Sequence, residues 1–439
     1  MPLASRTRHG LTVTRAFASG AALDARAAAR TRLARSRGMG PGAGAPVTDA
    51  DPLAGPVLDD PDPWYRSLHA SGPVHYCPRR DLWVISGYDE VRAAARAHDV
   101  LSSADGITRF RAPVPMLVAT DRPDHARLRR ILARDFTKDR LELLRPSIEE
   151  LAARCVDGIV AAPAGADAYG ALAGPIPLQI IAGILGVPDT DRADLHRWSD
   201  AAVQGFAMTP GPEGIRAFRR ILGDGSQMFT YFEQVIERRR VEPGDDALSR
   251  LVAYDDEQGR LTTDELLWFT LLLLVGGNET TTSVVMALLL AFAREPEQYD
   301  RLRADPGLIP RAIEEGLRWA TPIPAFFRTA RAPYAIGGVT VPAGGRVMLS
   351  FAAANRDPGR YAEPERFDLQ RDEQEHVAFG SGIHFCLGAH LARLELRIVL
   401  ETLIARVARV DVLGEPVWRR NPSLRGIDAM TVRFTPGAP

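Results

Sequence analysis

The chain has 439 residues, of which 46% are hydrophobic and 25% charged, and its formal net charge at pH 7 is −1. This balance is typical of a globular protein with a large buried core, and it gives no electrostatic basis for binding nucleic acid or an anionic membrane surface. Three cysteines are too few for a disulfide framework, so we expect a reducing compartment, the cytoplasm.

The first 45 residues contain eight arginines, much alanine and few acidic residues. This composition resembles a mitochondrial transit peptide, but it also fits a disordered bacterial extension, or translation begun upstream of a true start at Met39. We favour a disordered extension over residues 1–45, followed by one domain over residues 46–439.

Residues 121–129 predict a turn that leads into a helix. His125 and Arg129 are four residues apart and therefore share one face of this helix. That face is either a solvated basic surface or a seat for a carboxylate, for which two neighbouring cations are chemically suited. Farther along, a helical pattern over residues 144–238 is interrupted at Gly205–Gly214, which contains two prolines.

Leu261–Arg294 predicts one long buried helix, because its first half is apolar on all sides and cap signals precede it. No apolar run reaches the roughly 18 residues needed to span a bilayer, so we expect no membrane anchor.

The middle of this predicted helix, Gly276-Gly277-Asn278-Glu279-Thr280, is unusual. Each glycine costs about 1 kcal/mol relative to alanine in a helix, and an unpaired buried carboxylate costs more. Thr280 could bond back to the Gly276 carbonyl while Glu279 turns towards solvent. Alternatively, the polar centre could serve a ligand that needs close approach and protons.

Cys386 lies in a glycine-rich stretch, Phe379–Gly388, with a helical pattern directly behind it. Glycines let a flat ligand approach the main chain, and a thiolate just before a helix N-terminus is electrostatically favoured. A lone cysteine can also be an inert buried thiol, which is our interpretation of Cys77 and Cys155. Zinc is disfavoured, since no second Cys or His pair stands at the spacing of a structural site.

The pattern Phe-Gly-x-Gly-x-His-x-Cys-x-Gly at Phe379–Gly388 resembles the haem-binding loop of cytochrome P450 at every fixed position. Gly277-x-Glu279-Thr280 resembles the oxygen-activation motif of that family, and residues 121–129 resemble its propionate-binding helix. Glu315-x-x-Arg318, by itself an ordinary surface pair, and Arg366 in Pro364–Phe367 resemble its structural triad. The motifs follow the family's order between residues 57 and 436, so the chain is identified as a member.

The resemblance implies a mainly α fold with small β-sheets, a single triangular domain whose long central helix lies over haem b. It implies that Cys386 is the iron ligand and that Glu279 and Thr280 deliver protons. It places Glu315, Arg318 and Arg366 in a brace for the haem loop. The other implied haem contacts are His125, Arg129, Gly276, Gly277, Arg328, Phe379, His384 and Gly388. The implied substrate contacts are Ala325, Phe326 and Ile427, beneath a lid near Gly205–Gly214.

The activity implied by the resemblance is that of a monomeric bacterial monooxygenase. It would use O2, and two electrons from NAD(P)H through a ferredoxin reductase and a ferredoxin, to hydroxylate, epoxidise or O-dealkylate a small-to-medium hydrophobic substrate. Arg127, Arg130, Arg393 and Arg397 would form a basic docking face, or be solvated surface charge. Two alternatives stay open: a peroxide-driven peroxygenase, against which Glu279 and Thr280 argue, and a non-catalytic haem-thiolate protein that binds a ligand.

Overall fold

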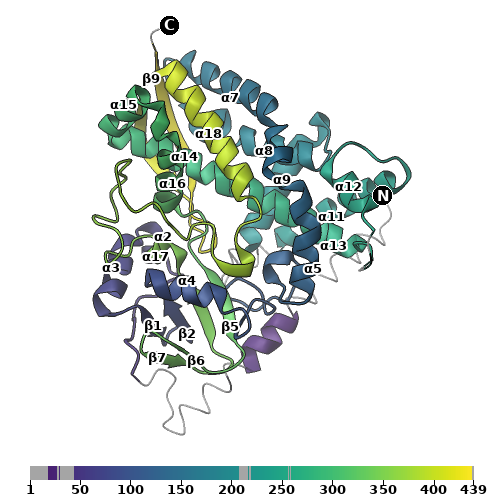
Figure 1. The fold of residues 1–439 in the computed structure, drawn as a ribbon, viewed down its shortest axis with the longest axis vertical. Coiled ribbons are helices and arrows are strands. Elements are labelled where there is room, and N and C mark those ends of the chain that lie inside the picture. The colour runs from purple at the N-terminus through teal and green to yellow at the C-terminus, as the bar shows by residue number, and fades with distance from the viewer. Residues whose placement is uncertain are drawn as a thin grey trace.

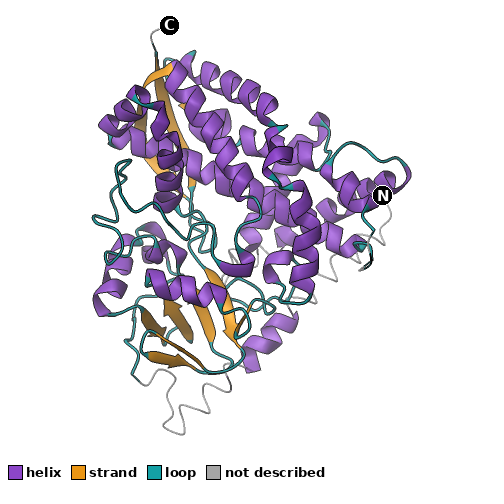
Figure 2. Ribbon diagram, viewed as in Figure 1, coloured by secondary structure: helices purple, strands orange, loops and turns teal. Residues whose placement is uncertain are grey.

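The computed structural model describes residues 18–26, 29, 44–206, 216, 219–255, 257 and 259–437. Helices make up most of this part of the chain and small sheets lie at its edges, as the sequence predicted (Figure 2). The longer helices include α3 (Asp62–Ser71), α7 (Arg145–Val160), α8 (Pro175–Ile184), α9 (Arg192–Phe206), α11 (Ser226–Val241), α16 (Ile309–Ala320) and α18 (Ala389–Arg406). Shorter ones include α2 (Gly55–Asp59), α4 (Tyr88–Arg96), α5 (Asp124–Leu132), α6 (Lys138–Glu142), α12 (Ala247–Ala253), α15 (Pro296–Ala304) and α17 (Phe351–Ala354).

The strands form three small sheets, and the largest has the order β1-β2-β8-β5-β3. In that sheet β2 and β8 run parallel while the other pairs are antiparallel. Its strands are β1 (Val74–Cys77), β2 (Leu82–Ile85), β3 (Leu101–Ser102), β5 (Phe326–Ala330) and β8 (Arg346–Leu349). The others are the hairpin of β9 (Val407–Trp418) and β10 (Ile427–Pro436) with β4 (Ala166–Asp167), and the hairpin of β6 (Tyr334–Ile336) and β7 (Val339–Val341). The first sheet and the β9–β10 hairpin lie at opposite ends of the molecule (Figure 1).

The predicted central helix is present, but its middle is wound more widely than an α-helix. It consists of α13 (Thr263–Leu274), a π-helical turn (Val275–Glu279) and α14 (Thr280–Arg294). A capping box between Thr262 and Glu265 begins it. The helix is long and apolar enough to cross a membrane, yet 67% of its most apolar window is buried inside the fold, as in the core helix of a globular protein.

A buried group of ion pairs fixes α16 against the loop that follows α17. Glu315 and Arg318 are 2% and 1% exposed, and Arg318 Nε donates to Glu315 Oε2 at 2.7 Å. The second arginine of this brace is Arg371, whose Nε lies 3.2 Å from Glu315 Oε1. The prediction of Arg366 was wrong. Its carbonyl oxygen accepts hydrogen bonds from Arg318 and Arg371, so its backbone faces the brace while its exposed side chain pairs with Glu363.

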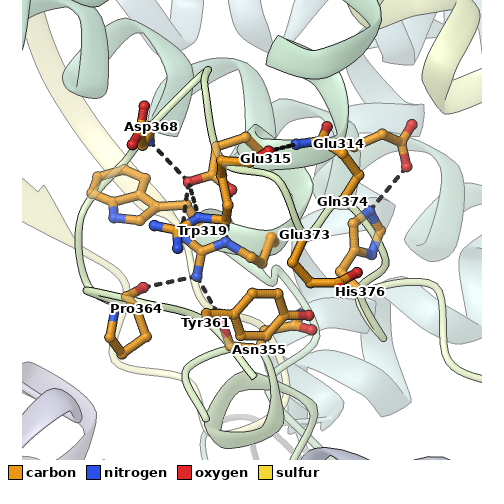
Figure 3. Close-up of polar contacts among 12 residues, drawn as sticks. Glu314, Glu315, Trp319, Asn355, Tyr361, Pro364, Asp368, Glu373, Gln374 and His376 are labelled. Carbon is orange, nitrogen blue, oxygen red and sulfur yellow. Dashed lines mark hydrogen bonds and ion pairs between the residues drawn. The ribbon is translucent and has the colours of Figure 1, made fainter. Parts of the chain in front are cut away.

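The brace extends to Asn355 and Pro364 (Figure 3), and Asn355 connects it to the glycine loop. Arg318 Nη1 donates to the carbonyl oxygens of Asn355 and Pro364, each at 2.7 Å. The Asn355 side chain in turn accepts a hydrogen bond from the Val377 amide at 2.8 Å, two residues before the loop begins. The ion pairs therefore hold the segment that leads into Phe379–Gly388.

Part of the predicted disordered extension is folded. Residues 18–26 form a helix, and Asp24 within it pairs with Arg111. The ion-pair partners of this helix, Arg109 and Arg111, lie in the loop between β3 and α5. The prediction of disorder is therefore wrong for residues 18–26, whereas residues 1–17 and the alternative start at Met39 lie outside the described residues.

Candidate active site

Cys386 lies near the end of a loop whose shape depends on two glycines. Gly380 and Gly382 have φ values of +71° and +72°, in the left-handed region that favours glycine. A Cβ at Gly382 would also lie 2.8 Å from the Ala95 carbonyl oxygen. The loop closes where the Cys386 amide donates to the Phe379 carbonyl oxygen at 2.9 Å. This closure places Cys386 in the floor of a cavity beneath the central helix.

The surroundings of the Cys386 thiol act on its ionisation in opposite directions. Burial raises the pKa of the thiol, whereas the Gly388 amide, Arg129 and Arg393 lower that pKa. A metal ion that binds a cysteine removes the thiol proton outright. The amide and the two arginines are then in place to stabilise the resulting thiolate.

Four basic side chains line the same cavity: His125, Arg129, Arg328 and His384. The two imidazole rings pack edge to face with centroids 4.5 Å apart. His125 Nε2 and His384 Nδ1 are buried and accept or donate no hydrogen bond. Among the residues that the structure describes, none of these four side chains forms an ion pair with a carboxylate.

Burial weakens the charged state of all four groups. It lowers the pKa of His125 to about 4, of His384 to about 2 and of Arg328 to about 10, and it lowers the pKa of Arg129. Buried cations are stable when an anion pairs with them. Two carboxylates entering this cavity would supply that charge, so the residues fit haem, with its two propionates, above a cysteine ligand.

The opposite wall of the cavity is the π-helical turn of the central helix. Thr280 Oγ1 donates to the Gly276 carbonyl oxygen at 2.6 Å, which is the local bond considered from the sequence. A Cβ at Gly276 would meet open space, whereas one at Gly277 would lie 2.4 Å from Ile181 Cδ1. The missing side chain at Gly276 thus leaves the cavity open, while Gly277 allows close packing against α8.

Glu279 is buried beside Thr280, but its carboxylate is held on the side of the β9–β10 hairpin. Arg419 Nη1 donates to Glu279 Oε2 at 2.8 Å, and Tyr169 donates to Oε1 at 3.2 Å. Arg419 also pairs with Asp428 at 2.6 Å. The pKa of Arg419 is raised because Glu279 and Asp428 outweigh its burial. Arg419 could not be predicted from the sequence, since 140 residues separate it from Glu279.

A second buried acid, Glu395 of α18, lies near the central helix. It is fully buried and neither of its oxygens accepts a hydrogen bond of normal geometry, although the Thr281 hydroxyl lies close enough to act on its charge. Burial raises its pKa to about 8, an effect that the Thr281 hydroxyl partly offsets. The sequence analysis missed this residue. Its position among the apolar residues of an otherwise buried helical stretch, Leu394–Leu400, was the available signal.

The predicted substrate contacts are only partly in the cavity wall. Phe326 lines the cavity, but Ala325 packs on the other face of the sheet with Phe327, because neighbouring residues in a strand point in opposite directions. Ile427 is also outside the wall, since it pairs with Trp418 and packs in the helical core. Ser423 and Leu424, just before that strand, line the cavity instead. Most of Gly205–Gly214, the predicted lid, lies outside the described residues.

Arg127 and Arg393, which the sequence placed in a basic docking face, are engaged in ion pairs. Arg127 pairs with Glu265, and Arg393 pairs with Glu314 at 2.7 Å. Arg393 also lies over the Phe379 ring, 4.7 Å from its centroid. Its main contacts are therefore with the glycine loop and α16.

Comparisons with known proteins agree with this arrangement. The family model described as cytochrome P450 matches residues 307–409. The chain is 39% identical to cytochrome P450 monooxygenase PikC of Streptomyces venezuelae, over 91% of this chain and 97% of that protein. It is 38% identical to beta-dihydromenaquinone-9 omega-hydroxylase of Mycobacterium tuberculosis, over 89% of this chain and 79% of that protein. The solved structure of CYP109E1 from Bacillus megaterium in complex with testosterone matches with a TM-score of 0.80 at 30% identity. The match covers 86% of this chain and 98% of that one.

Proposed function

Because this chain belongs to the cytochrome P450 family and is a P450 monooxygenase that binds haem b, we propose that Cys386 is its iron ligand and that it hydroxylates a bulky, mainly apolar substrate. One observation carries this proposal. Cys386 and Thr280 line the same cavity, in which four basic side chains lack a carboxylate partner among the described residues. That combination suits a dianionic, iron-containing ring.

When bound, the haem supplies the activation of dioxygen, and the protein supplies position and protons. The hydrogen of the Thr280 hydroxyl is engaged by Gly276, so the hydroxyl oxygen is free to accept a hydrogen bond from a water in the cavity. Glu279, next in the chain, is held by Arg419 and Tyr169. Rotation of the Glu279 side chain away from Arg419 would let its carboxylate take up a proton from solvent and pass that proton to the water, so Glu279 would act as a proton relay.

The proposed substrate class rests on the lining of the cavity. Beyond its basic residues the wall is built mainly of apolar side chains, among them Phe269, Leu273, Val284, Phe326 and Leu424. Similar proteins are named for large, apolar substrates: 6-deoxyerythronolide B and vitamin D3, in addition to the menaquinone derivative above. We therefore place this substrate among macrolide-, steroid- or prenyl-sized compounds.

The electron source belongs to the same proposal. We propose NAD(P)H, a ferredoxin reductase and a ferredoxin as partners of a monomeric cytoplasmic enzyme. The acid and hydroxyl at Glu279 and Thr280 favour O2 over peroxide as oxidant, because peroxide already carries both protons that such a relay would deliver.

The CO difference spectrum of the reduced protein tests the iron ligand. We expect the Soret band of a thiolate-ligated haem, and we expect it to be lost in Cys386→Ala. Cys155→Ala is the matched control, because Cys155 is also half-buried but lies outside the cavity lining. Retention of the thiolate band in Cys386→Ala would overturn the proposal.

Oxidant and substrate can be tested together. Product formed from vitamin D3 would be compared between NADH with a surrogate ferredoxin pair and hydrogen peroxide alone. We expect turnover to depend on the ferredoxin pair. Equal turnover with peroxide alone would favour the peroxygenase alternative.

A further inference from the structure

The helix formed by residues 18–26, which we call the N-terminal strap, is seated on the loop Asp105–Ala112. Its closest approach is at Gly20, where an added Cβ would lie 1.5 Å from the Arg111 carbonyl oxygen. Gly20 is buried, whereas Ala22 on the same helix is exposed. Only glycine therefore permits the strap to lie on this loop.

Asp24 of the strap contributes both charge and hydrogen bonds to the contact. Its Oδ1 accepts a hydrogen bond from Arg111 Nη1 at 2.7 Å, and its Oδ2 accepts one from the Arg111 amide at 3.2 Å. Arg109 Nη1 lies 3.7 Å from the same carboxylate. The Arg111 side chain is only 5% exposed, so its charge needs a counterion.

Arg111 belongs to a crowded group of cations beneath the loop. Arg346, 2% exposed, donates to the Gly106 carbonyl oxygen at 2.8 Å and to the Thr108 carbonyl oxygen. Burial and the neighbouring Arg111 lower the pKa of Arg346 to about 9. Asp105, whose Oδ2 lies 3.3 Å from Arg111 Nε, is the only other carboxylate that the structure pairs with Arg111 among the described residues. Without Asp24, Arg111 would keep only Asp105 as a paired carboxylate within the described part of the chain.

The loop under the strap forms part of the cavity wall. Ile107 and Thr108 line the cavity above Cys386, and Gly106 and Ala112 line a second cavity next to it. The Ile107 carbonyl oxygen also accepts a hydrogen bond from the Phe327 amide at 3.0 Å, beside the wall residue Phe326. Any displacement of this loop therefore changes the space available to a bulky ligand.

We propose that the N-terminal strap helps to shape the substrate pocket. Asp24 is the positioning residue that holds the loop Asp105–Ala112 in the cavity wall. The effect on ligand affinity rests on the proposed function, whereas the restraint of the loop does not. The strap lies far from Phe379–Gly388 in the sequence, yet through the loop Asp105–Ala112 it helps to determine the size of substrate that the pocket accepts.

Hydrogen exchange in the full-length holoprotein tests the restraint directly. Gly20→Ala adds the one methyl group that the contact excludes, and alanine is the better helix former, so loss of helix propensity cannot explain the result. We expect amides of residues 105–112 to exchange at least tenfold faster in Gly20→Ala and in Asp24→Asn, with exchange in α18 unchanged. Ala22→Leu, on the exposed side of the strap, and Asp24→Glu should behave as the wild type. Unchanged exchange of 105–112 in both Gly20→Ala and Asp24→Asn would overturn the proposal.

Azole titrations test the consequence for binding. Imidazole is small enough to bind a haem iron with little contact to the cavity wall, whereas clotrimazole carries three further rings that would have to fit against that wall. We expect Gly20→Ala and Asp24→Asn to weaken the affinity for clotrimazole about tenfold and to leave the affinity for imidazole unchanged. Equal effects on the two ligands would refute a role in the pocket wall. If the purified protein bound no haem, the proposed function would fail, whereas hydrogen exchange measured on that haem-free protein would still decide whether the strap holds the loop.

Discussion

The region around Glu315 and the region around Glu395 both place a carboxyl group in the interior, yet they treat it in opposite ways. Glu315 accepts hydrogen bonds from two arginines and from the Asp368 amide. Glu395, on the neighbouring helix α18, is equally buried and accepts none. A buried carboxylate is stable when cations and donors surround it, and it otherwise takes up a proton.

Glu279 lies between these two cases. It has the charge partner of a structural pair, Arg419, but it adjoins Thr280 and the cavity. The comparison therefore separates three tasks for a buried acid: Glu315 is fixed by two arginines, Glu279 is paired with one arginine beside a site of chemistry, and Glu395 lies without a cation and has a raised pKa. Each task predicts a different response when the carboxyl becomes an amide.

The largest effect is expected for Glu315→Gln. This change leaves Arg318 and Arg371 buried without their anion, and breaking such a pair costs about 3–5 kcal/mol. We expect a corresponding loss in the free energy of unfolding and poor retention of haem, measured by denaturant titration and by the haem-to-protein ratio. Glu363→Gln, in the exposed pair with Arg366, should change neither quantity. Similar losses in both variants would show that the buried brace contributes no more to stability than the exposed pair does.

The next effect is expected in catalysis for Glu279→Gln, which keeps the shape of the side chain and removes the carboxylate that relays protons. General acids contribute on the order of 100-fold or more to rate, so we expect product formation to fall by about that factor. A larger share of the NADH consumed should then appear as hydrogen peroxide. The matched control is Asp428→Asn, which removes the other carboxylate bound to Arg419. A loss of the same size there would assign the effect to Arg419 rather than to proton delivery.

A smaller, pH-dependent effect is expected for Glu395→Gln. Burial raises the pKa of Glu395 to about 8, from about 4.3 in an unfolded chain. Between these values the folded protein holds a proton that the unfolded chain has lost, so stability decreases as pH rises, by about 1.4 kcal/mol per pH unit. The amide removes this dependence. Thermal unfolding at pH 6, 7 and 8 should show the stability of Glu395→Gln rising relative to that of the wild type at each step. Parallel profiles of stability against pH would contradict a raised pKa of Glu395.

The sequence predicted those features of the fold and the candidate site that depend on residues close together in the chain. The glycine loop at Cys386, the long helix with its polar centre, and the Glu315–Arg318 pair are all of this kind. Arg371 was missed because a loop has no regular repeat of buried positions, so its sequence does not show which arginine side chain is buried. Arg419 and Asp24 were missed because each meets its partner across many residues, 140 from Glu279 to Arg419 and 87 from Asp24 to Arg111. Such pairings follow from tertiary packing, which local patterns do not contain.

The smallest effect concerns the one polar neighbour of Glu395. The Thr281 hydroxyl lowers the pKa of that carboxyl, so Thr281→Val should raise the pKa further and move the pH at which stability levels off to a higher value. We expect a displacement of about one pH unit, because a hydrogen bond to a charged group contributes about 1.5–3 kcal/mol and this contact falls short of normal hydrogen-bond geometry. Thr281→Ser keeps the hydroxyl and should restore the wild-type profile. If Val and Ser gave the same displacement, the shift would come from altered packing between the central helix and α18, and Glu395 would owe its neutral state to burial alone.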